Sequence, residues 1–128
     1  MLAYQHYQRG MPVCPIIRLG RERFATALFA NPPVVPFAAP ARSATLSELA
    51  NGVSGRTLFC GDLDEQTKNE LMHTLGDNAL FPTPAANMRR AGFLAELAWQ
   101  RWQYGSADDR ATLEPIYLGS PVKQLPAS

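Results

Sequence analysis

The chain has 128 residues, of which 46% are apolar and 18% are charged, and its formal net charge is +1. This length fits a single domain over residues 1–128, and the apolar content excludes a disordered chain. A nearly neutral chain without a dense Lys/Arg surface is poorly suited to hold a phosphate backbone, so direct nucleic-acid binding is not expected.

The first ten residues lack the basic start and apolar core of a signal peptide, and no apolar stretch is long enough to span a bilayer. We therefore expect a cytoplasmic protein with no membrane association. Cys14 and Cys60 each lie inside an apolar run, which predicts buried, reduced thiols. A disulfide between neighbouring strands is the alternative.

The first third of the chain predicts a short helix followed by three strands. Leu2, Ala3 and Tyr7 have helical spacing before Gly10 ends the segment. Residues 13–19 and 23–30 read as strands joined by a short Gly-containing turn, and residues 34–40 as a third strand at an edge or bulge, because they include a proline. Together they predict an antiparallel meander.

Helices and strands then alternate. The order predicted is a helix over residues 43–53, a strand over 56–62, a helix over 64–76, a brief strand over 78–84, a long helix over 85–105 and a final strand over 114–118. Thr45 with Glu48 forms a capping-box pattern for the first of these helices, and acidic residues begin the second.

The long helix has two apolar strips. The wider strip predicts a core helix, and a narrower one beside the polar face is covered either by the same domain or by a partner, so that a homo-oligomer is possible. The wider strip holds Ala91, Leu94, Ala95, Ala98 and Trp102, and the narrower one Phe93, Leu97 and Tyr104.

No catalytic constellation emerges from the remaining polar residues. His6 and His73 have no partners at metal-ligand spacing and read as surface histidines. Asp62, Asp64 and Glu65 fit a helix N-terminus. No glycine-rich phosphate loop is present, and Gly61 reads as a plain strand exit. The sequence therefore predicts no catalytic, cofactor-binding or metal-binding residues and no cofactor.

Two further groups of residues are expected to have structural roles. Asp108, Asp109 and Arg110 fit a solvated turn. The aromatic residues Trp99, Trp102 and Tyr104 fit core packing better than a platform for stacking bases, because they have helical spacing.

The element order and two short motifs resemble the second half of the TsaB (YeaZ) family, formerly classed with the glycoproteases of the peptidase M22 group. In "RLGRERF", Arg21 matches the family's Arg, Phe24 replaces its Tyr, and Arg18 stands where an Asp is usual. The chain then closes with Pro115-Ile116-Tyr117-Leu118, where Gly119 replaces the usual Arg.

The resemblance implies an α/β fold, namely one lobe of the actin-like ATPase (ribonuclease H-like) fold, with a mixed sheet led by three antiparallel strands and helices packed on it. The first lobe is expected to be absent, and residues 2–9 would be the end of the helix that connects the lobes.

By the same resemblance, the function is that of a non-catalytic scaffold. TsaB-type proteins act with TsaD-like, TsaE-like and TsaC-like proteins in the threonylcarbamoyladenosine modification of tRNA. The family's dimer and TsaD contacts are formed mainly by the first lobe, so this chain is expected to have lost most of them. The alternatives are an M22-type hydrolase or nucleotide-dependent enzyme lobe, and a free-standing small α/β adaptor.

Overall fold

The computed structural model describes residues 1–30, 39–105 and 109–118. In chain order its elements are the 3-10 helix η1 (Tyr4–Arg9), the strands β1 (Val13–Gly20), β2 (Arg23–Thr26) and β3 (Arg42–Thr45), helix α1 (Leu46–Asn51), strand β4 (Thr57–Gly61), helix α2 (Glu65–Leu75), the 3-10 helix η2 (Gly76–Asn78), strand β5 (Ala79–Leu80) and helix α3 (Ala91–Gln103).

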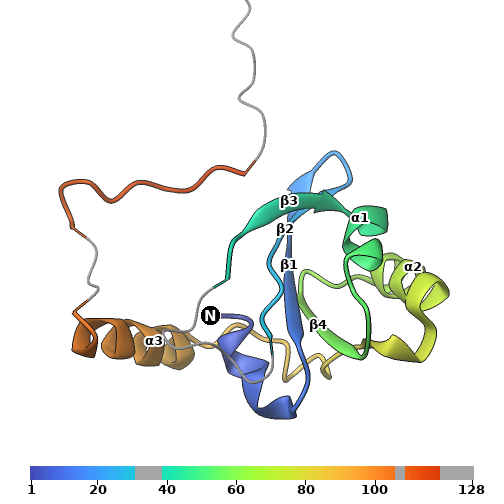
Figure 1. The fold of residues 1–128 in the computed structure, drawn as a ribbon, viewed down its shortest axis with the longest axis horizontal. Helices are drawn as coiled ribbons and strands as arrows, with labels where there is room; N and C mark the ends of the chain where they lie inside the picture. The colour runs from blue at the N-terminus through green and yellow to red at the C-terminus, as the bar shows by residue number, and fades with distance from the viewer. Residues whose placement is uncertain (31–38, 106–108, 119–128) are drawn as a thin grey trace, which may run out of the picture.

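The strands form one mixed sheet in the order β3-β2-β1-β4-β5 (Figure 1). The pairs β1/β2 and β2/β3 are antiparallel, whereas β1/β4 and β4/β5 are parallel. Arg21 and Glu22 join β1 to β2 with φ angles of 51° and 59°, the left-handed backbone that a tight hairpin turn requires. An α/β fold with a mixed sheet led by three antiparallel strands is therefore confirmed.

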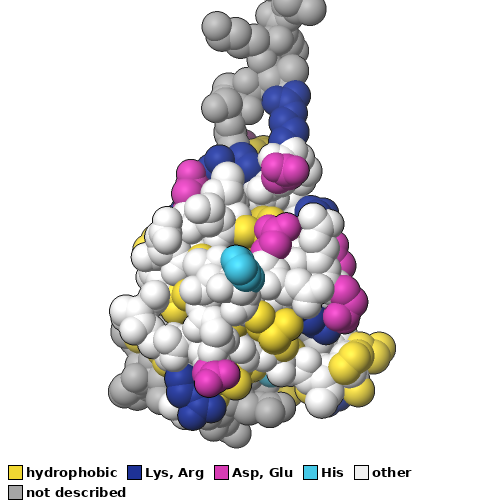
Figure 2. All heavy atoms as spheres, turned by 90° about the vertical axis from the view of Figure 1, so that its right-hand side faces the viewer, with side chains coloured by type: hydrophobic (Ala, Val, Ile, Leu, Met, Phe, Trp, Pro, Cys, Tyr) yellow, Lys and Arg dark blue, Asp and Glu magenta, His cyan; other side chains and the backbone are white. Residues whose placement is uncertain are grey.

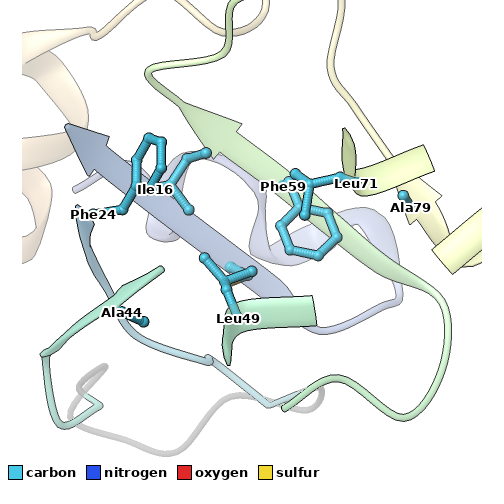
Figure 3. Packing of buried hydrophobic residues seen from close by; sticks show 8 residues of the cluster. Ile16, Phe24, Ala44, Leu49, Phe59, Leu71 and Ala79 are labelled. Atoms are coloured by element: carbon cyan, nitrogen blue, oxygen red, sulfur yellow. The ribbon is translucent and has the colours of Figure 1, made fainter. Parts of the chain in front are cut away.

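One face of the sheet packs against α1 and α2. Ile16 of β1 and Phe59 of β4 are fully buried there, and Leu49 of α1 and Leu71 of α2 close over them (Figure 3). Burying a side chain of this size contributes about 1.5–3 kcal/mol relative to leaving it exposed. This layer is the main core of the domain.

The N-terminal segment covers part of the opposite face. Leu2 and Ala3 pack against Leu58 and Cys60 of β4, whereas Cys14 of β1 belongs to the core under α1 and α2. Because side chains alternate along a strand, the two thiols lie on opposite faces of the sheet. Both are free and buried, so the predicted buried thiols are confirmed and the alternative disulfide is excluded.

Two helix starts follow the predicted capping chemistry. The Thr45 hydroxyl accepts a hydrogen bond from the Glu48 N–H at 3.2 Å, and a Glu48 carboxylate oxygen accepts one from the Thr45 N–H at 3.1 Å. Asp64 caps α2 by accepting a hydrogen bond from the Thr67 N–H at 2.7 Å. The capping box and the helix-start interpretation of Asp64 are confirmed.

Two predicted strands need correction. The stretch over residues 34–40 lies mostly outside the described residues, and the third strand is instead β3, immediately before α1. The predicted strand over residues 114–118 is wrong, since the described residues there pair with no strand and Ile116 and Tyr117 are exposed.

The long helix begins six residues later than Ala85, where it was predicted to start. Residues 84–90 are not helical, because their backbone and side chains are engaged elsewhere. The Gln5 Nε2 donates to the carbonyls of Ala86 and Met88 at 2.7 and 2.8 Å, and Asn87 binds the backbone of β4. These tertiary hydrogen bonds replace the first turns of the predicted helix.

The predicted orientation of α3 is also wrong. Helix α3 lies on the side of the molecule away from α1 and α2 and contacts η1 (Figure 1). Phe93 packs edge-on against the Tyr4 ring at 6.2 Å between centroids, and the Gln100 Nε2 donates to the Tyr4 hydroxyl at 2.9 Å. Phe93 and Leu97 of the narrow strip are thus partly covered by the same chain, while the side predicted as core, including Leu94, faces outward.

Candidate functional site

The carboxyl ends of β1 and β4 form the best candidate for a functional site. These strands are parallel neighbours, so their ends meet at one edge of the sheet. Arg18 lies near the end of β1, and Asp62 and Asp64 follow β4 directly. In open α/β sheets, ligands bind at this edge.

Ion pairs connect these residues to one another. The Arg18 Nη2 lies 2.7 Å from Asp64 Oδ2, and the Arg18 backbone N–H donates to Asp62 Oδ2 at 2.9 Å. The Arg89 Nη2 lies 3.0 Å from Asp62 Oδ1. Each carboxylate therefore has a guanidinium partner, so neither is an uncompensated charge.

The Arg18 guanidinium has three kinds of neighbour. It contacts the Asp64 carboxylate, donates to the Thr67 hydroxyl at 3.3 Å, and lies 5.2 Å from the centroid of the Phe24 ring. A cation over an aromatic face gains a further electrostatic attraction. Arg18 thus fixes a positive charge near the end of β1.

The neighbours of Asp64 shift the pKa of its carboxyl group. Hydrogen bonds from the Thr67 hydroxyl and backbone N–H lower the pKa of Asp64 below its usual value of 3.8, and the Arg18 charge adds to this effect. Asp64 is therefore ionised throughout the neutral range. Its lowered pKa results from capping α2 rather than from pairing with a second acid.

Gly61 at the end of β4 has no room for a side chain beside Ile16 of β1. A Cβ atom at this position would lie 2.2 Å from the Ile16 carbonyl oxygen, and the φ angle of Gly61 is 108°. The backbone continues with the Asp62 N–H donating to the Ile16 carbonyl at 2.9 Å. Glycine is required here so that β4 can turn and deliver Asp62 to the edge of the sheet.

Asn87 holds this turn from the other side. Its Oδ1 accepts from the Gly61 N–H and its Nδ2 donates to the Gly61 carbonyl, both at 2.8 Å. Neither Asn87 nor Arg89 was singled out in the sequence, because both lay inside the predicted long helix. The lone Asn before two arginines carries no pattern that would have revealed these contacts.

Two hollows lie near the candidate site. One of about 340 Å³ is lined by Arg18, Glu22, Phe24, Thr45, Asp64 and neighbouring residues. The other, of about 680 Å³, lies between α1 and α2 and shares Leu46, Ser47, Gln66 and Glu70 with the first. The surface over these helices mixes acidic, basic and small apolar areas without a dominant charge (Figure 2). The hollow of about 340 Å³ is lined by one arginine and by the three carboxylates of Glu22, Asp64 and Glu70, so its lining is net acidic.

The prediction of surface positions is confirmed for one histidine and wrong for the other. His73 is exposed on α2 as expected, but His6 is only 2% exposed, so its interpretation as a surface histidine is wrong. His6 belongs to the 3-10 helix η1, which follows the sheet-packed Leu2 and Ala3 and contacts α3. Within residues 1–30, 39–105 and 109–118, no group of three His, Cys, Asp or Glu side chains could hold a metal ion.

The predictions for the acidic turn and for the aromatic residues of α3 have different outcomes. Asp109 and Arg110 are exposed, and Asp109 Oδ1 accepts from the Ala111 N–H at 2.9 Å, as expected for a solvated turn; Asp108 lies outside the described residues. Core packing of Trp99, Trp102 and Tyr104 is wrong, because all three side chains are exposed.

Comparison with known proteins identifies no relative. No protein-family model matches the chain, and no curated protein matches it. In the part of the chain that the structure describes, no helix is both long and apolar enough to cross a membrane. The functional interpretation therefore depends on the geometry of the strand ends and on the motifs of the sequence.

Proposed function

We propose that the chain is a non-catalytic interaction module of the TsaB type, which supports threonylcarbamoyladenosine modification of tRNA together with TsaD-like and TsaE-like proteins. The observation that carries this proposal is the pairing of both strand-end carboxylates with arginines. Asp62 pairs with Arg89, and Asp64 pairs with Arg18 while capping α2.

The ion pairs bear on function because they occupy the carboxylates, not because they stabilise the fold. The Arg18 and Asp64 side chains are 47% and 55% exposed, so solvent screens their ion pair and it contributes little to stability. However, a divalent cation or a general acid–base pair needs carboxylates that are free to bind a metal or a proton. A guanidinium paired with each carboxylate opposes both, which favours a structural role for this edge.

The sheet supports the fold part of the proposal. The order β3-β2-β1-β4-β5, with three antiparallel strands first and helices joining the later strands, is compatible with one actin-like (ribonuclease H-like) lobe. The family resemblance supplies the finer assignment. A mixed sheet alone is shared by many functions, so the sequence motifs and the paired carboxylates must be considered together.

A nucleotide-dependent or M22-type enzyme lobe is the second candidate. It is favoured by the hollow of about 340 Å³ beside Arg18 and Asp64, which lies at the edge where α/β sheets bind ligands. Arg18 is the side chain in this hollow with the chemistry to contact a phosphate. The two candidates therefore differ in whether Arg18 serves a ligand or the protein itself.

Two assays separate them. We expect the purified chain to associate with a TsaD-like or TsaE-like protein, weakly, in chemical cross-linking or sedimentation. We also expect no ATP or peptide hydrolysis with Zn²⁺ or Mg²⁺ present. The matched variants are Arg18→Ala, which opens the network, and Arg56→Ala, which changes an exposed arginine outside the network.

The outcomes are distinct. Failure to associate with either partner would contradict the TsaB-type role. Saturable ATP binding that Arg18→Ala abolishes and Arg56→Ala preserves, or turnover lost on Asp62→Asn, would instead establish the enzyme candidate.

A further inference from the structure

Helix α3 presents an uncharged apolar face that remains exposed in the described part of the chain. At 100° per residue this face lies on the side of α3 opposite to Phe93 and Gln100, which contact Tyr4 of η1. Leu94, Trp99 and Trp102 on this face are 56%, 61% and 67% exposed. We call this surface the α3 apolar face; its residues are Ala91, Leu94, Ala95, Ala98, Trp99 and Trp102.

The size of the α3 apolar face exceeds that of ordinary scattered surface residues. A fully buried Trp contributes about 150–250 Å², so the two indoles and Leu94 leave roughly 400 Å² of contiguous apolar surface. Such a patch marks an interaction site on many proteins. Two copies packed through it, with the alanines included, bury roughly 1,000 Å² in total, which reaches the lower range of specific interfaces.

The arrangement of side chains fits a second copy of the same chain. A two-fold symmetric interface requires that each residue meet its symmetry counterpart. Leu94 and Trp102 are each four residues from Ala98, on the same side of the helix. In an antiparallel pair of helices that crosses at Ala98, Leu94 of each copy therefore meets Trp102 of the other. The interface contains two such contacts, related by the two-fold axis.

The small residues and the lack of charge support this packing. Ala95 and Ala98 lie between the large side chains and let two helix axes approach to the short end of the usual distance of about 8–10 Å. The α3 apolar face contains no charged residue, so two copies oppose no like charges. A negatively charged partner such as nucleic acid gains no electrostatic attraction from this face.

We propose that the α3 apolar face forms a symmetric antiparallel dimer with a second copy of this chain, in which Ala98 lies at the two-fold axis. The contact between Tyr4 and Phe93 holds each α3 on its own domain, so the helices meet as rigid extensions of the two bodies. The dimer rests on this face alone and is independent of the proposed TsaB-type role.

Cross-linking at the two-fold axis tests the symmetry. We expect Ala98→Cys to form a disulfide-linked dimer under mild oxidation, because its two sulfur atoms meet at the crossing point. Gln103→Cys is the matched control, since Gln103 is exposed on the same helix but outside the α3 apolar face. Cys14 and Cys60 are buried and do not compete while the domain is folded.

Sedimentation of the wild-type chain provides the second readout. We expect a concentration-dependent dimer whose dissociation constant rises at least tenfold in Trp102→Ala, with unchanged circular dichroism. Met88→Ala, which changes an exposed apolar residue outside α3, should leave the constant unchanged.

Three results would overturn the proposal. In the first, the wild-type chain stays monomeric at high micromolar concentration. In the second, Ala98→Cys and Gln103→Cys cross-link equally. In the third, a single-stranded oligonucleotide quenches the tryptophan emission of a monomeric chain.

Discussion

Helix α2 has 3 apolar residues among 11 and α3 has 8 among 13, yet it is α2 that packs on the sheet. Leu71 of α2 is buried with Phe59 beneath it, whereas Leu94 and Trp102 of α3 face outward. Helix α2 connects two adjacent parallel strands, so the chain itself places it on the sheet. Helix α3 follows the last strand, and its position depends on side-chain contacts with η1.

This difference shows what an amphipathic pattern does and does not determine. Periodicity identifies the side of a helix that favours burial, but it does not name the surface that buries it. For α2 the sheet provides that surface. For α3 the stacked rings of Tyr4 and Tyr7, 5.1 Å apart, attract Phe93, and the wider apolar strip remains available.

The largest expected effect contrasts a core aromatic residue with one on α3. Phe59→Ala should lower the free energy of unfolding by about 4 kcal/mol, because it leaves a cavity in the main core. Trp102→Ala should change it by less than about 0.5 kcal/mol in the monomer, since that side chain is exposed. Urea unfolding at a protein concentration below dimer formation measures both. Similar losses in the two variants would show that α3 is part of the core.

The turn after β4 gives the next largest effect. Gly61→Ala should cost about 3 kcal/mol, because the new Cβ meets the Ile16 carbonyl and the φ angle is positive. Gly55→Ala is the matched control, since a Cβ at Gly55 meets nothing within 4 Å. Thermal unfolding of both variants checks this. A stable Gly61→Ala variant would contradict the close approach of β1 and β4.

Asn87 allows the same turn to be tested from its other side. Asn87→Ala should cost about 2 kcal/mol, because the Gly61 N–H and carbonyl both lose their side-chain partner. Asn87→Asp retains the acceptor but loses the donor, and it places a negative charge near the Gly61 carbonyl. It should therefore restore little of the stability in chemical denaturation. Full recovery in Asn87→Asp would mean that only the Gly61 N–H bond matters.

Acid titration provides the smallest effect and isolates the Asp64 charge. Because the pKa of Asp64 is lower in the folded chain, its ionisation stabilises the fold fully above the usual value of 3.8. That contribution disappears as the pH falls through the folded pKa. Asp64→Asn keeps a good helix cap but removes the charge. The difference in melting temperature between the wild-type chain and this variant should therefore be constant near pH 7 and vanish in stronger acid. A difference that grows in acid would contradict this sign.

The sequence predicted the parts of the fold that depend on local chemistry. Thr45 and Glu48 form the expected capping box, Asp64 begins α2, and Gly61 ends a buried strand. These features involve residues within a few positions of one another. Their geometry follows from short-range hydrogen bonding and backbone preference.

Features that depend on distant contacts were not predictable in this way. Residues 84–90 contain good helix formers, yet Asn87 and the carbonyls beside it bind residues far away in the chain. The pairs of Arg18 with Asp64 and of Arg89 with Asp62 join segments that only the fold brings together. In the sequence, Asp62 and Asp64 indicated only a helix start, so neither a site at the strand ends nor its arginine partners was predicted.

The most direct test of the contrast between the two helices is acrylamide quenching of tryptophan emission in dilute solution. Trp99 and Trp102 are the two tryptophans of the chain, and both lie on α3, so the emission reports on this helix alone. We expect red-shifted emission and quenching close to that of free indole in the monomer, with a blue shift and protection as concentration rises. Blue-shifted, protected emission at the lowest concentration would contradict an α3 apolar face that the chain leaves uncovered.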